Sequence, residues 1–191
     1  MKRLINPFYY IAGGKALAWG VLFLLGNTLL LNCASMAQDT PVHFSYVQHY
    51  SFLQTLGQQL LMWLLPALLL WGAGVLLSSS KIRPIDIFGT TAFTQLLMLP
   101  MGAMLLFPQF QVLQQEVLQQ TLSGQIPPTG EVLLLMGYGF FALFMLIWYY
   151  VWNYHAFSVS CNVRGSKAVI TFIAAEILTT IIGNCFALWQ P

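Results

Sequence analysis

The sequence has few charged residues. Seven Lys and Arg and five Asp and Glu make up only 6% of its 191 residues. Soluble domains carry about 25% charged residues, so this chain cannot cover a globular surface with charge. A net charge of +2 is also too small to provide the basic surface that binds DNA or RNA. These shortages exclude an ordinary soluble domain, a disordered chain and a partner made of nucleic acid.

Hydrophobic residues make up 58% of the chain, and the mean hydropathy is +0.73. Five stretches reach the roughly 20 apolar residues that a membrane-crossing helix needs. None alternates apolar and polar positions, so helices are favoured over the strands of a barrel. The sequence predicts an all-α, polytopic membrane bundle and one domain over residues 1–191. The five spans are expected at about 15–34, 57–77, 87–107, 132–152 and 168–189.

All basic residues fall in three segments, which five spans place on the same side of the membrane. They are Lys2, Arg3, Lys15, Lys81, Arg83, Arg164 and Lys167. The positive-inside rule then puts the N-terminus in the cytoplasm and the C-terminus outside. Four or six spans would break this agreement, so the span count and the charges support each other.

The first span has an alternative interpretation as a cleavable signal peptide. Lys2 and Arg3 make a basic start, and residues 35–37 could end a cleavage site. However, the segment before the apolar run is long and contains Asn6 and Pro7, and the run is longer than a typical signal core. We therefore expect the span to be retained.

Two segments outside the spans are expected to lie at the membrane surface. Residues 4–14 combine aromatic side chains with Pro7 and lead into the first span as an interfacial segment. Residues 110–122 place apolar side chains at helical spacing among glutamines, which predicts an amphipathic helix, with a solvated loop as the alternative. Pro66 and Pro100, inside the second and third spans, are expected to kink their helices.

Glu176 is the one acid within the fifth span. It lies nine residues after Lys167, or about 13 Å into the membrane at 1.5 Å per residue. A charge at such depth costs about 2.5–3.5 kcal/mol on insertion scales, so Glu176 must face the bundle, pair or hold a proton. Thr179, Thr180 and Asn184 follow on the same helix face and make a polar stripe with it.

Polar residues of other spans lie at comparable depths. Gln95 lies nine residues after Asp86 in the third span, and Asn27 lies farther along the first. Depth therefore proposes Gln95 as the partner of Glu176. We infer a buried polar layer centred on these two residues, with Asn27 and Asn184 nearer the outer leaflet and with Thr179 and Thr180 beside Glu176. It is either a site for a proton, ion or solute, or a structural clasp worth about 1 kcal/mol per hydrogen bond. The clasp is favoured.

Reactive groups are otherwise scarce. The sequence has no H-E-x-x-H, no paired acids and no G-x-S-x-G, so we expect no catalytic residue, no metal and no cofactor. His43, His49 and Asp39 could bind a metal, but their spacing matches no strong template and a solvated loop is expected. Cys33 and Cys185 could form a disulfide, although two free buried thiols are expected.

Several segments resemble the Yip family of Ypt/Rab-interacting membrane proteins, in particular its compact prokaryotic branch. They are Asn6 and Pro7 before the first span, residues 85–90 with Leu99 and Pro100 in the third, Trp148 and Trp152 in the fourth, and residues 164–168 before the fifth. The resemblance implies five spans and a cytoplasmic N-terminus. It carries over no catalytic residue. Eukaryotic members have a long cytoplasmic region, whereas this sequence has about 15 residues there, which puts a GTPase-binding role in doubt.

The expected function is a non-enzymatic scaffold or partner-binding membrane protein. Its expected partners are membrane lipids and either another protein or a second copy of the chain. The alternative is a small transporter or channel component that uses Glu176. A membrane enzyme ranks third, because no second reactive group accompanies Glu176 or His155. The resemblance favours the cytoplasmic (inner) membrane of a bacterium.

Overall fold

A computed structural model describes residues 2–40, 43–47 and 50–187. Its described part contains five helices long and apolar enough to cross a membrane, which confirms the predicted helical membrane bundle. They are Gly13–Cys33, Phe52–Leu77, Pro84–Leu105, Thr129–Ser160 and Gly165–Cys185. The fifth was expected to reach residue 189, and residues 188–191 lie outside the described part. The chain is therefore an integral membrane protein by helix length and composition.

The third span is interrupted. It consists of α4 (Pro84–Phe93), a 3-10 segment η2 (Thr94–Met98) and α5 (Leu99–Leu105). Pro100 has no backbone N–H, and the N–H of Leu99 bonds to the carbonyl of Leu96 in the tighter 3-10 pattern. The break next to Pro100 agrees with the kink expected there. Pro66, by contrast, lies inside the continuous helix α3 (Phe52–Leu77).

The third span packs closely against α2 (Gly13–Cys33). Gly20 of α2 faces Ala92, and a Cβ added at Gly20 would lie 2.7 Å from the backbone nitrogen of Phe93. Gly89 of α4 approaches the carbonyl oxygen of Gly13 in the same way. Lipid tails are as apolar as the helices, so close backbone approach through small residues is what holds membrane helices together. This contact forms the centre of the fold.

The segment after α2 forms a β-hairpin that the sequence did not predict. β1 (Met36–Thr40) pairs antiparallel with β2 (His43–Tyr46), and every residue of β1 is buried. The prediction of an all-α fold with a solvated loop here is therefore wrong in this segment. The reason is physical: a segment packed between α3 and α8 (Gly165–Ala187) is shielded from water, so its backbone groups need partners, and pairing two strands supplies them.

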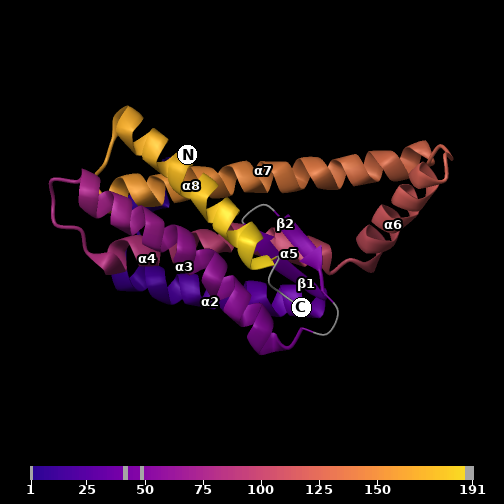
Figure 1. The fold of residues 1–191 in the computed structure, drawn as a ribbon, viewed down its shortest axis with the longest axis horizontal. Helices are drawn as coiled ribbons and strands as arrows, with labels where there is room; N and C mark the ends of the chain where they lie inside the picture. The colour runs from indigo at the N-terminus through magenta and orange to yellow at the C-terminus, as the bar shows by residue number, and fades with distance from the viewer. Residues whose placement is uncertain (1, 41–42, 48–49, 188–191) are drawn as a thin grey trace.

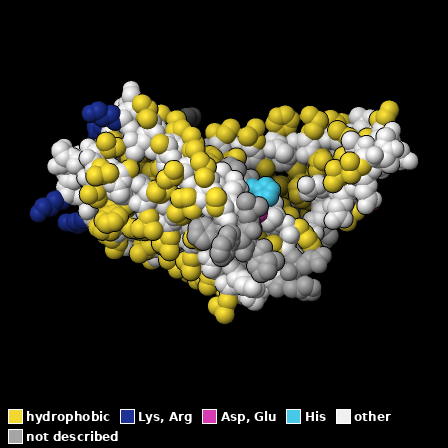
Figure 2. Space-filling view, viewed as in Figure 1, with side chains coloured by type: hydrophobic (Ala, Val, Ile, Leu, Met, Phe, Trp, Pro, Cys, Tyr) yellow, Lys and Arg dark blue, Asp and Glu magenta, His cyan; other side chains and the backbone are white. Residues whose placement is uncertain are grey.

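The hairpin gives the bundle two distinct ends (Figure 1). We call the end that holds β1 and β2 the hairpin end. At the other end lie the connections between α3 and α4 and between α7 and α8, and the Lys and Arg side chains in view gather there (Figure 2). We call it the basic end. The N-terminal segment, α1 (Lys2–Ile5) and η1 (Pro7–Tyr9), is tied to α7, since Trp148 Nε1 and Trp152 Nε1 both donate to the carbonyl of Leu4.

Helix α7 (Thr129–Ser160) is the longest element, and α6 (Pro108–Leu122) folds back from its far end (Figure 1). Residues 110–122 are thus helical, as one of the two alternatives predicted. The half of α7 nearest the basic end is packed: Tyr149, Trp152, Asn153, Ala156 and Phe157 are buried. Trp152 stacks on Phe93, with ring centroids 5.9 Å apart. The other half of α7 extends past the hairpin end with apolar side chains exposed.

Candidate functional site

The polar stripe predicted on α8 is divided between the inside and the surface of the chain. Thr179 is buried, Glu176 and Thr180 are half-buried, and Asn184 is exposed. The two hydroxyls bond within their own helix, Thr179 to the carbonyl of Ala175 at 2.9 Å and Thr180 to that of Glu176 at 3.0 Å. The expectation that the whole stripe points inward is wrong for Asn184. The hydroxyls serve the helix backbone rather than a shared site.

Asn27 contacts Gln95, whereas the depth argument proposed Gln95 as the partner of Glu176 and placed Asn27 nearer the outer leaflet. Asn27 Nδ2 donates to the backbone carbonyl of Gln95 at 3.0 Å, and both residues are buried. In a regular α-helix that carbonyl would accept from Leu99, whose N–H bonds instead to Leu96. Asn27 therefore serves a backbone group next to the break in the third span. The side-chain oxygen of Gln95 is buried without a hydrogen bond to the described residues.

Glu176 stands apart from this pair. Its carboxylate makes no hydrogen bond within the described part of the chain, and it interacts electrostatically with the hydroxyls of Tyr149 and Tyr150 on α7. No hydrogen bond among the described residues links it to Asn27 or to Gln95, the partner that depth proposed. The structure thus resolves the predicted layer into a clasp between α2 and the third span and a separate carboxylate between α8 and α7.

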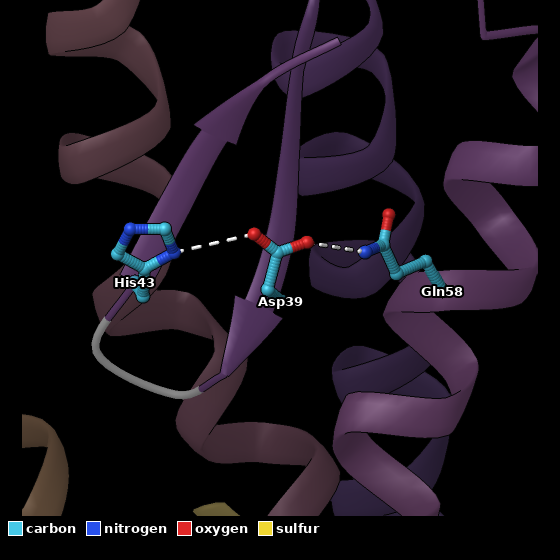
Figure 3. A network of polar contacts seen from close by, with 3 residues as sticks. All are labelled: Asp39, His43 and Gln58. Carbon is cyan, nitrogen blue, oxygen red and sulfur yellow. Dashed lines mark hydrogen bonds and ion pairs between the residues drawn. The ribbon is translucent and has the colours of Figure 1, made fainter. Parts of the chain in front are cut away.

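A second polar cluster lies at the hairpin end (Figure 3). Asp39 of β1 is only 7% exposed, and both carboxylate oxygens have partners. Gln58 Nε2 of α3 donates to Oδ1 at 3.0 Å, and His43 Nδ1 of β2 lies 3.2 Å from Oδ2. A carboxylate accepts, so the Nδ1 atom must carry the proton. At the adjacent positions, Gln59 Nε2 donates to Gln38 Oε1 at 2.8 Å and fixes the strand to the same helix.

The charge on Asp39 has no basic residue beside it other than His43. The one ion pair among the described residues is His43 with Asp39, and the Lys and Arg side chains in view gather at the basic end. Burial, together with the negative charge of Asp39, raises the pKa of the Tyr50 hydroxyl. Asp39 is therefore a buried acid held by an imidazole and an amide.

A cavity of about 540 Å³ lies between the hairpin, α5 and α6. His43 and Met36 line it from the hairpin, Met101 and Met104 from α5, and Gln111 from α6. We call it the hairpin cavity. A second hollow, of about 830 Å³, lies between α5 and the exposed half of α7 and is lined almost wholly by apolar side chains. Of the two, only the hairpin cavity is lined by a histidine, His43, and the hydrogen bond to Asp39 holds the orientation of its ring.

Sequence reasoning named Asp39 and His43 but assigned them to a solvated loop. That assignment is wrong for Asp39, because β1 is buried and its carboxylate is fully hydrogen-bonded. His49 lies outside the described residues. Gln58 carried no signal, since a glutamine near the start of an apolar helix is ordinary. The separation of Asp39 and His43 by four positions was the one available clue, and it becomes meaningful only when the pairing of β1 with β2 is known.

The cysteines differ from expectation in their exposure. Cys33, Cys161 and Cys185 are all free, as expected, but Cys33 and Cys185 are exposed and Cys161 alone is buried. Among the described residues no three His, Cys, Asp or Glu side chains gather as a metal site.

Comparisons with protein-family models, curated proteins and solved structures gave no match.

Proposed function

We propose that the chain is a non-enzymatic scaffold or partner-binding membrane protein of Yip-like type. The observation that carries the proposal is the bare half of α7. Leu133, Met136, Phe140 and Phe144 on this half are all more than half exposed. Only 11% of the most apolar window of α7 is buried inside the chain. An apolar face of this length is a natural surface for another membrane helix.

The length of α7 supports this reading. Gly74, near the last residue of α3, packs against Cys161, which directly follows α7. The two helices therefore end at the same level at the basic end. From Cys161 to Ala142, which lines the hairpin cavity, is about 28 Å of helix, close to the roughly 30 Å of a hydrocarbon core. Residues 129–141 continue for about 20 Å more. Tilting shortens this excess, and a bound partner would cover what remains.

The internal polar groups support a scaffold as well. Thr90, Thr91 and Thr94 each donate to a backbone carbonyl of their own helix, and Trp63 Nε1 donates to Thr91 at 3.3 Å. The threonine bonds satisfy the hydroxyls within the third span, and the Trp63 bond joins α3 to α4, as in a structural helix contact. The structural clasp is thus the better account of Asn27 and Gln95.

Orientation and location belong to the same proposal. The gathering of basic side chains at one end supports a cytoplasmic basic end, with the N-terminus inside and the C-terminus outside. The Yip-like motifs favour a bacterial cytoplasmic (inner) membrane. Cysteine accessibility to a membrane-impermeant maleimide tests the orientation: a Ser80→Cys variant should react only after the membrane is permeabilised.

The test of partner binding is site-specific photocrosslinking in the native membrane. A photoreactive amino acid at Phe140 in α7 is compared with one at Ile170 in α8, a residue of similar exposure on another helix. We expect a discrete, near-stoichiometric protein adduct from position 140 and none from position 170. Adducts with lipid alone at both positions would refute the proposal. Mild-detergent purification and mass spectrometry then identify the adduct as a second copy or another protein.

One observation favours the second candidate, a transporter or channel component. Glu176 is a membrane-embedded acid without a hydrogen bond to the described residues, and such acids often mark ion or proton paths. Glu176→Gln tests this idea in liposomes, with Thr180→Val as a matched polar control on the same helix. A proton or cation flux that is lost only in Glu176→Gln supports transport, and equal fluxes in all three proteins exclude it.

A further inference from the structure

The side chain of His43 is oriented in the way that metal-binding histidines are. Its Nδ1 atom bonds to the carboxylate of Asp39, which is held in turn by Gln58. Figure 3 shows the second ring nitrogen, Nε2, on the edge of the ring that faces away from Asp39. No described residue bonds to it. Metal-ligating histidines almost always donate their other N–H to a carboxylate or carbonyl, which fixes the tautomer and makes the free nitrogen more basic.

The same cavity gathers three thioethers. Met101 and Met104 are three residues apart on α5, so their side chains leave the same face of the helix. Met36 begins β1, and all three line the hairpin cavity together with His43. No carboxylate lines it. Thioether and imidazole donors without carboxylates select soft cations such as copper(I), whereas magnesium and calcium need oxygen ligands.

The two residues of this pair differ in exposure. Asp39 is 7% exposed, whereas 65% of the His43 side chain is exposed. The buried carboxylate therefore holds Nδ1, while the edge of the ring that carries Nε2 is open to an incoming ligand.

We propose that the hairpin cavity binds a soft monovalent cation, copper(I), through His43 Nε2 and the thioethers of Met36, Met101 and Met104. Asp39 is a positioning residue, which acts on the cation through His43. The cation would tie β1, β2 and α5 together at one point. This inference is independent of the partner-binding proposal, because it uses neither α7's exposed face nor a second protein.

The test measures copper(I) affinity of the full-length protein in detergent, under anaerobic conditions, by competition with the chromophoric chelator bicinchoninate. Exposed thiols also bind copper(I), so all proteins carry Cys33→Ser and Cys185→Ser. We expect one equivalent bound per chain. The double variant Met101→Leu/Met104→Leu should lose at least tenfold in affinity. These changes conserve volume and should leave the fold intact, as monitored by gel filtration. Met136→Leu, on the exposed face of α7, is the matched methionine control and should bind as the parent does.

Two further variants separate the roles of the acid and the imidazole. His43→Asn should weaken binding at least tenfold, and Asp39→Asn should weaken it about 10–100-fold while the methionines stay in place. X-ray absorption of the bound copper should show both sulfur and nitrogen neighbours. The proposal fails if the parent binds no better than Met101→Leu/Met104→Leu, or if the spectrum shows sulfur alone. Silver(I), which is inert to oxidation, repeats the experiment in air, and zinc(II) of equal concentration should not compete.

Discussion

The third span and helix α7 are opposites. The most apolar 18-residue stretch of the third span has a mean hydropathy of only 1.3, yet 72% of that stretch is buried inside the chain. The corresponding stretch of α7 has a mean hydropathy of 2.1, and only 11% of it is buried. In water the more apolar helix would form the core, but in a membrane apolar surface is already solvated by lipid. Hydropathy in this protein therefore reports contact with lipid, and it does not identify the core.

Side-chain size explains the difference. The buried α4 contains Gly89, Thr90, Thr91 and Ala92 in succession, small residues that let α2 approach closely. The exposed half of α7 carries leucines and phenylalanines, whose size prevents the close approach of two helix backbones. Gly72, Gly137 and Gly139, in α3 and α7, have nothing within 4 Å of an added Cβ, whereas Gly20 and Gly89 meet backbone atoms. Small residues hold the helices together only where they are in contact.

The largest expected effect is on the rate at which maleimide modifies Cys161, the one buried cysteine among the described residues. Cys161 caps the buried half of α7, and burial raises the pKa of its thiol to about 12. The thiolate is the form that reacts with maleimide, so at pH 8 its population falls roughly a thousandfold below that of an ordinary thiol. In detergent, mass spectrometry should find Cys33 and Cys185 modified and Cys161 intact until denaturant is added. Equal labelling of all three cysteines would mean that this end of the bundle is open.

The contact between α2 and the third span should be the most sensitive to added volume. Gly20→Ala places a methyl group on Ala92 and the backbone of Phe93, and backbone atoms cannot move aside locally. We expect a loss of about 3 kcal/mol in the free energy of unfolding, measured by denaturant titration in detergent. The matched variant Gly137→Ala in α7 meets no neighbour and should show no loss. If the two variants are equally stable, the close packing described for Gly20 is wrong.

Removing the amide of Asn27 should have a smaller effect. Asn27→Ala leaves the carbonyl of Gln95 unpaired next to the break in the third span. An unpaired buried acceptor costs about 1–2 kcal/mol, and the same titration measures it. Asn184→Ala on exposed α8 is the control and should change stability little. A loss confined to ion or solute transport, with unchanged stability, would instead make Asn27 part of a functional site.

The five helices could be predicted from the sequence, because apolar length accumulates along one helix. The hydrogen bond between Asn27 and Gln95 was not predicted, because depth placed Gln95 beside Glu176 and Asn27 nearer the outer leaflet. Apolar length defines a span, and residue count from the basic end gives depth. The separation of Glu176 from that pair could not be predicted, because depth says nothing about which helices are neighbours. For the same reason, depth could not predict that Asn184 is exposed on the surface of α8.

The hairpin escaped prediction for another reason. Residues 36–46 contain Gln38, Asp39 and His43, which reads as a polar loop when each residue is taken alone. Gln38 and Asp39 are nevertheless buried, while His43 is exposed, because α3 and α8 pack over β1. Gly183 of α8 lies so close that an added Cβ would be 2.9 Å from the carbonyl of Asp39. Only this tertiary contact turns a polar segment into a strand and gives Asp39 its two partners.

The smallest effect is expected on the bare helix, and it tests the comparison directly. Leu143 of α7 is half exposed and Leu97 of the third span is buried, so the same Leu→Ala change removes the same atoms from two environments. Leu97→Ala should lose about 2–5 kcal/mol through the cavity it leaves. Leu143→Ala exchanges a lipid contact for another lipid contact and should lose less than about 0.5 kcal/mol. Denaturant titration at several protein concentrations measures both. A large, concentration-dependent loss for Leu143→Ala would show that a second copy covers this face of α7, since only an interface between chains responds to dilution.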